Sequence, residues 1–185
     1  MILTDSIIYL GPLSITIPII IGIVLYRYLG IEEKVILLYL IIGGVVDSLL
    51  FLFTNNNKYT IHLYQVFTQI EFIFVSTFYI LILKEFINYR NLLLVNALIF
   101  IVLLINSFII NLDIILDSLS VVLVDITIFI YSFVFIFQVS FSGSKKTIRR
   151  SIIILNYSFL FYASTSLFVY LFGYFFTREI FIQVW

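Results

Sequence analysis

The chain has 185 residues, of which 63% are hydrophobic and 11% are charged, and its mean hydropathy is +1.23. Soluble domains are roughly half apolar and a quarter charged, so this composition excludes an ordinary water-soluble fold. Ten Lys and Arg residues balance ten Asp and Glu residues, so no net charge attracts nucleic acid, and nucleic-acid binding is excluded as a function.

Six apolar runs follow one another along the sequence, and short polar segments separate them. A helix of about 20 residues, rising about 1.5 Å per residue, crosses the hydrocarbon core of a bilayer. The runs lack the alternating pattern of barrel strands, so they predict helices. We therefore expect an all-α fold, a polytopic transmembrane helical bundle forming one domain, with spans at residues 6–28, 35–53, 61–83, 92–110, 118–141 and 151–176.

The first and last segments depart from this simple pattern. Pro12, Pro18 and Gly22 interrupt the first run, and a proline inside a helix removes a backbone hydrogen bond, so we expect a bent helix. Residues 180–185 end in Trp185 and are too short to cross a membrane. They predict either an interfacial tail, since Trp is enriched at headgroup depth, or the start of a truncated seventh helix.

The distribution of Lys and Arg predicts the orientation of the chain, because basic loops stay on the cytoplasmic side of a membrane. Eight of the ten Lys and Arg residues lie in the loops after the first, third and fifth runs, and only Lys58 and Arg178 lie on the opposite side. We therefore expect an N-terminus outside the cytoplasmic (inner) membrane, with the loop 142–150 in the cytoplasm.

The loop 142–150 carries four basic residues, Lys145, Lys146, Arg149 and Arg150. Basic side chains beside a membrane attract anionic lipid headgroups by about 1 kcal/mol each. The loop is therefore interpreted either as a lipid-contacting segment or as a determinant of topology alone.

Three acidic residues lie inside the apolar runs, at Asp47, Glu71 and Asp125. A charge at the bilayer centre costs on the order of 2.5 kcal/mol or more, so such groups usually face the bundle interior and have partners. No Lys or Arg lies at matching depth. The acids are therefore expected to be protonated, to share hydrogen bonds with neutral groups, or to hold a bound cation.

The run 61–83 has one polar half. At 100° per residue, its polar side chains, with Thr77 as the exception, fall within about half of the circumference: His62, Tyr64, Gln65, Thr68, Gln69, Glu71, Ser76 and Tyr79. We expect this half to face the bundle interior and to form a polar centre that contacts a ligand, an ion or a partner, made of Asp47, Glu71, Asp125, Tyr64, Gln65, Thr68 and Gln69. The alternative is packing alone, with protonated carboxyls that hydrogen-bond helices together.

The last run carries a second polar stripe, Ser158, Tyr162 and Thr165, which is interpreted as polar contacts between helices. Asn156 lies elsewhere on the same run, and Asn96 and Asn106 lie on the fourth.

Two stretches resemble a known family. Residues 62–74, HLYQVFTQIEFIF, and residues 157–164, YSFLFYAS, are similar to segments of a loosely characterised bacterial family. That family resembles a multi-helix membrane input region, sometimes fused at its C-terminus to a histidine kinase, and Trp185 stands where the seventh helix of such a region would begin. The resemblance implies a sensory or scaffold module with Tyr64 and Glu71 in its core. It carries over no catalytic residue.

The sequence lacks phosphate loops, nucleophile elbows and HExxH motifs, and it has no Cys and one His. We expect no catalytic residue, no metal site and no cofactor. The expected function is a non-enzymatic signal-input or complex-forming module, whose partners are membrane lipids and another membrane protein or a second copy. Two alternatives remain open: a cation or proton channel or transporter that uses the three acids, and a small structural subunit of a larger membrane complex.

Overall fold

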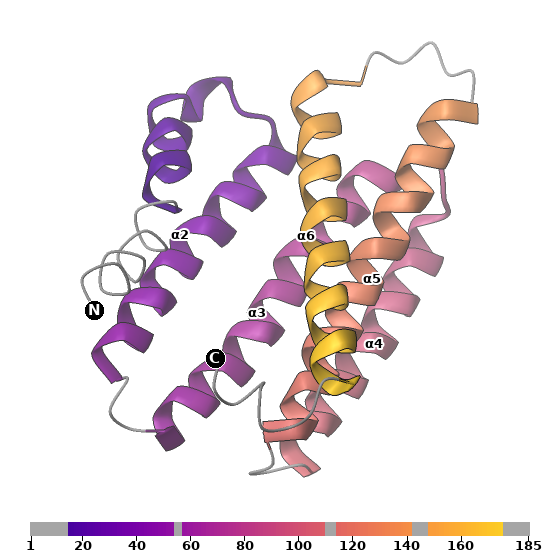
Figure 1. Cartoon of the computed structure of the whole chain (residues 1–185). Helices are drawn as coiled ribbons and strands as arrows, with labels where there is room; N and C mark the ends of the chain where they lie inside the picture. The colour runs from indigo at the N-terminus through magenta and orange to yellow at the C-terminus, as the bar shows by residue number, and fades with distance from the viewer. Residues whose placement is uncertain (1–14, 54–56, 110–113, 142–147, 176–185) are drawn as a thin grey trace. The chain divides into compact units, whose positions relative to one another are not determined.

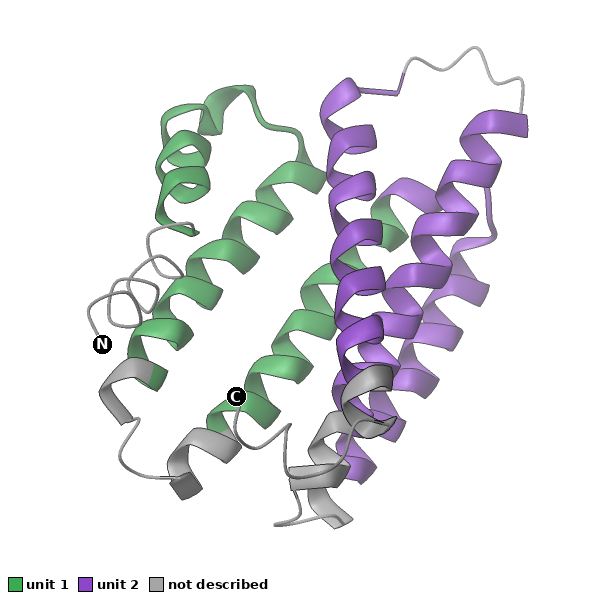
Figure 2. Cartoon of the chain, in the orientation of Figure 1, with its two compact units in different colours: residues 1–81 green, residues 82–185 purple. Residues whose placement is uncertain are grey.

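The structure is a computed structural model that describes residues 15–53, 57–109, 114–141 and 148–175, and the described residues form helices without strands (Figure 1). The chain divides into two compact units, Met1–Leu81 (unit 1) and Ile82–Trp185 (unit 2) (Figure 2). The all-α prediction is confirmed for the described residues. Trp185 and most of the basic loop lie outside them.

Unit 1 contains the apolar helix Ile15–Val24, the short 3-10 helix η1 (Tyr26–Tyr28), α2 (Ile31–Phe53) and nearly all of α3 (Asn57–Leu83). Unit 2 contains α4 (Tyr89–Ile109), α5 (Ile114–Phe141) and α6 (Arg150–Phe175). These helices cover the predicted runs from 35–53 onward, and most begin a few residues earlier. Pro12 lies outside the described residues.

The start of α2 is fixed by its own side chains. The Glu33 carboxylate accepts a hydrogen bond from the backbone N–H of Gly30, the residue before the helix. This is one half of a capping box, which satisfies a backbone donor that the helix leaves free. Lys34 lies over the ring of Tyr26, with its Nζ 4.6 Å from the ring centroid, and thereby links η1 to α2.

Close approaches at glycine bring the helices of unit 1 together. A Cβ atom on Gly22 would overlap the side chain of Leu37, and one on Gly44 would lie 3.4 Å from the side chains of Ile15 and Ile19. Small residues of this kind let helix backbones approach in membranes. Because Gly22 meets α2 near its start and Ile15 meets it further on, the first helix runs antiparallel to α2.

The helices of unit 2 are also antiparallel. Asn106 of α4 donates a hydrogen bond to Ser120 near the start of α5, and Asn156 near the start of α6 donates to the carbonyl of Ser132 in the second half of α5. A second α5–α6 bond joins Asp125 to Ser166, further along α6. The order of contacts is thus reversed along neighbouring helices, as expected for a chain that crosses a layer repeatedly.

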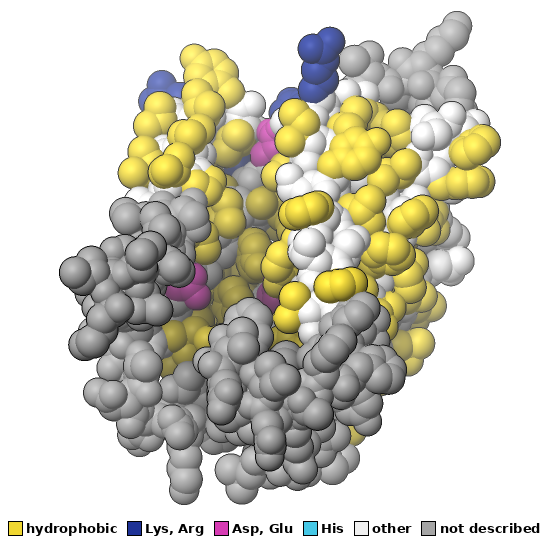
Figure 3. Space-filling model, in the orientation of Figure 1, with side chains coloured by type: hydrophobic (Ala, Val, Ile, Leu, Met, Phe, Trp, Pro, Cys, Tyr) yellow, Lys and Arg dark blue, Asp and Glu magenta, His cyan; other side chains and the backbone are white. Residues whose placement is uncertain are grey.

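The helices of unit 2 bury narrow stripes and expose wide apolar faces. On α4 the buried stripe is Leu92, Asn96 and Leu103, and on α6 it is Ile152, Asn156 and Ala163. Beyond its first turn, α4 exposes a broad face of large apolar residues: Leu93, Leu94, Val95, Leu98, Ile101, Val102 and Ile105. Apolar faces this wide on the surface are unusual for a water-soluble protein, although some polar side chains such as Asn96 and Asn156 are buried. Figure 3 shows the apolar side chains, in yellow, on the visible face of the described helices.

Four described helical segments are long and apolar enough to cross a membrane: Leu63–Leu83, Tyr89–Ser107, Leu119–Phe141 and Arg150–Tyr170. The segment Ile15–Val24 is apolar but shorter. α2 is not among the four, and it carries Glu32, Glu33 and Lys34 in its first turn and Asp47 further along. Length, composition and the inverted surface together indicate a membrane protein.

The polar stripe predicted on the last run lies on the exposed side of α6. Ser158, Tyr162 and Thr165 are exposed on α6. Ser158 and Thr165 donate instead to backbone carbonyls of their own helix, at Ile154 and Phe161. A hydroxyl bonded in this way needs no partner on another helix. Asn156 and Ser166 make the contacts with α5.

Candidate functional site

Glu71 joins α3 to α2 through a tyrosine. The hydroxyl of Tyr39 donates a hydrogen bond of 2.8 Å to Oε1 of Glu71, whose side chain is only 6% exposed. The two residues lie 32 positions apart, so the bond depends on how the helices pack and not on local sequence. A neutral hydroxyl thus accompanies an acid that lies inside an apolar run of the sequence.

Aromatic rings hold the Tyr39 side chain in place. Phe67 stacks on Tyr39 with ring centroids 6.2 Å apart and an interplanar angle of 15°, and Phe74 lies at 6.4 Å. Phe67 also lies opposite Gly43, where a Cβ atom would be 3.6 Å from its ring. Aromatic pairs at these distances are attractive beyond simple burial. Phe67 and Phe74 therefore flank the tyrosine ring whose hydroxyl bonds to Glu71.

The other predicted residues of α3 have mixed environments. Thr68 is buried, and its hydroxyl donates to the backbone carbonyl of Tyr64 at 3.0 Å. Gln65 and Gln69 are half-buried, whereas the Tyr64 side chain is 50% exposed. The polar half of α3 thus contains both buried and exposed side chains. The His62 side chain lies outside the described part of the chain.

In unit 2, Asp125 is bonded to a hydroxyl on a neighbouring helix, as Glu71 is in unit 1. Its side chain is 1% exposed, and its Oδ2 accepts a 2.6 Å hydrogen bond from the hydroxyl of Ser166 on α6. The pattern matches that of Glu71: a buried acid on one helix and a neutral hydroxyl on its neighbour. Sequence reasoning found both acids and missed both hydroxyl partners, Tyr39 and Ser166.

Asparagines supply further polar contacts around α5. Asn96 is buried on α4, its amide donates to the carbonyl of Leu92 at 2.8 Å, and it also interacts with the phenol of Tyr131 on α5. Asn156 lies 3.4 Å from the carbonyl oxygen of Ser132. α5 therefore has polar contacts with both of its neighbours in unit 2.

Asp47 has a different setting from the other two acids. It lines a hollow between the Ile15–Val24 helix and α2, and it is half-buried. Among the side chains that the structure describes, none is hydrogen-bonded to Asp47. Asp47 and Glu71 thus have separate neighbours within unit 1, and Asp125 belongs to unit 2. A polar centre shared by all three acids stays a prediction.

The acidic side chains within the described ranges do not form a metal-binding cluster. Those ranges contain no group of three or more His, Cys, Asp or Glu side chains that would hold a metal ion. Glu71 and Asp125 instead accept hydrogen bonds from hydroxyls on neighbouring helices.

The basic loop is described only at its end. Arg149 and Arg150 are exposed at the start of α6. Lys145 and Lys146 lie outside the described residues. Whether the loop contacts lipid therefore stays a prediction from sequence.

Comparison with known proteins gives no relative to which this chain can be assigned. No family model, no curated protein and no solved structure matches it significantly.

Proposed function

We propose that the chain is an integral protein of a bacterial cytoplasmic membrane that crosses it six times, with the N-terminus outside. Four helices have the length and apolarity of membrane spans, and α2 and the run 6–28 supply the remaining two. The antiparallel contacts within each unit support repeated crossing. The excess of Lys and Arg in alternate loops supports the orientation.

The absence of Cys from the sequence makes this topology directly testable with single cysteines. We expect Asn55→Cys, before α3, to react with a membrane-impermeant maleimide in right-side-out vesicles. Glu85→Cys, between α3 and α4, should react only after the vesicles are permeabilised, since alternate loops lie on opposite sides. The cysteine-free chain is the control for background labelling. Equal labelling of both variants in sealed vesicles would contradict the six-span topology.

Within this topology, we propose a non-enzymatic signal-input or complex-forming role. This proposal rests on the observation that Glu71 and Asp125 each link two helices through a hydrogen bond from a neutral hydroxyl. Such a bond stabilises helix association in membranes by only about 0.6 kcal/mol on average. A ligand, ion or partner that binds the carboxyl more strongly would change the helix packing, which is what a signal-input module requires.

The partners of such a module are lipids and another membrane protein or a second copy of this chain. Support comes from the exposed apolar faces of α4 and α6, which need an apolar environment. The likeness of residues 62–74 and 157–164 to a sensor input region agrees with the same role.

Replacing all three acids tests the proposed role. We expect the triple variant Asp47→Asn, Glu71→Gln, Asp125→Asn to insert normally. In mild detergent it should no longer associate with its partner, another membrane protein or a second copy of this chain, as measured by co-purification and by particle mass. Each substitution keeps a hydrogen-bonding group of the same shape, so a fault in folding is not expected. The matched control is Glu32→Gln with Glu85→Gln, which removes carboxylates at the start of α2 and in the loop after α3.

Two results would contradict the role. One is wild-type assembly in the triple variant at unchanged expression. The other is a proton, Na⁺ or K⁺ flux in liposomes that Glu71→Gln abolishes, which would assign the acids to a conduction path instead.

A further inference from the structure

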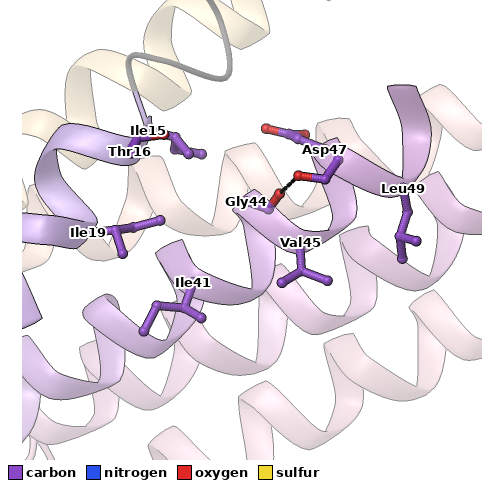
Figure 4. Close-up of a pocket in the computed structure, with 9 residues that line it drawn as sticks. Ile15, Thr16, Ile19, Ile41, Gly44, Val45, Asp47 and Leu49 are labelled. Atoms are coloured by element: carbon purple, nitrogen blue, oxygen red, sulfur yellow. Dashed lines mark hydrogen bonds between the residues drawn. The ribbon is translucent and has the colours of Figure 1, made fainter. Parts of the chain in front are cut away.

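A hollow of about 390 Å³ lies between the Ile15–Val24 helix and α2, within unit 1. Small-molecule pockets typically have volumes of about 300 to 1,000 Å³, so the hollow is large enough for a small ligand. Apolar side chains from both helices make most of its wall, and its polar lining residues are Thr16, Asp47 and Ser48. Figure 4 shows Asp47 and Gly44 on α2, with Ile15, Thr16 and Ile19 on the other helix.

Gly44 lines the hollow at a point where the two helices lie close together. A Cβ atom at this position would already lie 3.4 Å from the side chains of Ile15 and Ile19, which stand on the opposite wall. A longer side chain would occupy the space between the two helices. A large side chain at position 44 would therefore have to enter the hollow beside Asp47 or push the two helices apart.

The polar groups of α2 in the hollow are hydrogen-bond acceptors. The Ser48 hydroxyl donates its proton to the carbonyl of Gly44 at 2.7 Å, so only its lone pairs remain for a ligand. No described side chain donates to Asp47, whereas Glu71 and Asp125 have hydroxyl donors. The complementary ligand therefore carries donors.

A single carboxylate matches one positive charge. Ca²⁺ takes about six to eight oxygen ligands and Mg²⁺ requires octahedral coordination, and the described residues contain no group of three acids that would supply them. A primary ammonium group has three donors and no acceptor, which suits a carboxylate beside a hydroxyl oxygen. An aliphatic chain on that group suits the apolar wall.

We infer that this hollow binds one small primary alkylammonium ion, with the ammonium group at Asp47 and the aliphatic part between Ile19 and Val45. The inference deepens the proposed signal-input function and rests on it, because it names the class of ligand that one of the three acids recognises. Binding would bridge the first helix and α2, and so would change how they pack.

The test is binding to the full-length protein in a non-ionic maltoside detergent at pH 8. The probe is n-hexylammonium, and 1-hexanol is the neutral probe of the same length. We expect n-hexylammonium to bind wild type and to raise its unfolding temperature, with 1-hexanol binding roughly tenfold more weakly or worse, since a charge-assisted hydrogen bond is lost.

Two variants and one control locate the site. Asp47→Asn should weaken n-hexylammonium binding by roughly tenfold or more, because it removes the charge and keeps the shape. Gly44→Leu should weaken binding of both probes, because it fills the hollow and keeps the carboxylate. Glu32→Gln, on the same helix but outside the hollow, should bind like wild type.

The inference is overturned if Asp47→Asn binds n-hexylammonium as tightly as wild type, or if 1-hexanol binds equally well. If wild type does not bind but the triple-acid variant still loses assembly, the ligand inference fails and the proposed function stands. If binding depends on Asp47 but the triple-acid variant assembles normally, the inference is supported and the proposed assembly role fails.

Discussion

The Leu98→Arg variant should be destabilised by about 2.5 to 3.5 kcal/mol, the cost of an arginine at the centre of a membrane helix. Leu98 lies near the middle of α4, and its side chain is 64% exposed. In water, an exposed position of this kind tolerates substitution within about 0.5 kcal/mol. The cost of this substitution therefore distinguishes the two environments. It is large if the exposed face of α4 contacts acyl chains, and small if that face contacts water.

The measurement is the fraction of protein inserted in the membrane, together with the free energy of unfolding in bilayer-like bicelles. Asn91→Arg is the matched control, since it adds the same charge at an exposed position near the start of α4, where an arginine side chain reaches the interface. Leu98→Phe controls for size. Normal insertion and stability of Leu98→Arg would remove the basis for placing α4 in a bilayer.

Asp125→Ala should cost about 1 to 3 kcal/mol of unfolding free energy, because it leaves a cavity and deprives Ser166 of its acceptor. Asp125→Asn should lower the free energy of unfolding much less, since an amide oxygen can still accept a hydrogen bond from the Ser166 hydroxyl. A double-mutant cycle with Ser166→Ala isolates the bond itself. The coupling energy expected for the pair is about 0.6 to 1.7 kcal/mol, as for other hydrogen bonds between membrane helices.

Thr127→Ala is the control for this cycle. Thr127 is also buried on α5, but its hydroxyl donates to the carbonyl of Leu123 in its own helix. It should therefore show no coupling to Ser166→Ala. Unfolding of all variants by sodium dodecyl sulfate titration gives the free energies. A coupling near zero for the Asp125–Ser166 pair would mean that the 2.6 Å contact does not stabilise the packing of α5 on α6.

Helix content and membrane character follow from the sequence because both depend on local properties. Apolar runs such as Leu119–Phe141 carry their length and hydropathy in consecutive residues, so their helices were predictable without any knowledge of packing. The same holds for Glu71, Thr68 and Ser76, which share one face of α3 at helical spacing and are buried in the structure.

Partners across helices were not predictable, because they depend on the rotation and register of each helix. Ser166 lies 41 residues from Asp125, and nothing local marks it as different from Ser158, which faces outward. A weak signal did exist on α6. Asn156 and Ala163 are seven residues apart, and an asparagine in line with a small residue is typical of a membrane helix interface.

The two bonds between α5 and α6 restrict how these helices can slide. Asp125 and Ser132 are seven residues apart on α5, which is about 10 Å along the axis at about 1.5 Å per residue. A piston shift of one helical turn, about 5.4 Å, would break both contacts at once. Sliding of α6 along α5 is therefore opposed at two positions along the helices, so a ligand that displaced only the Asp125–Ser166 bond would favour tilting of the pair over a piston shift.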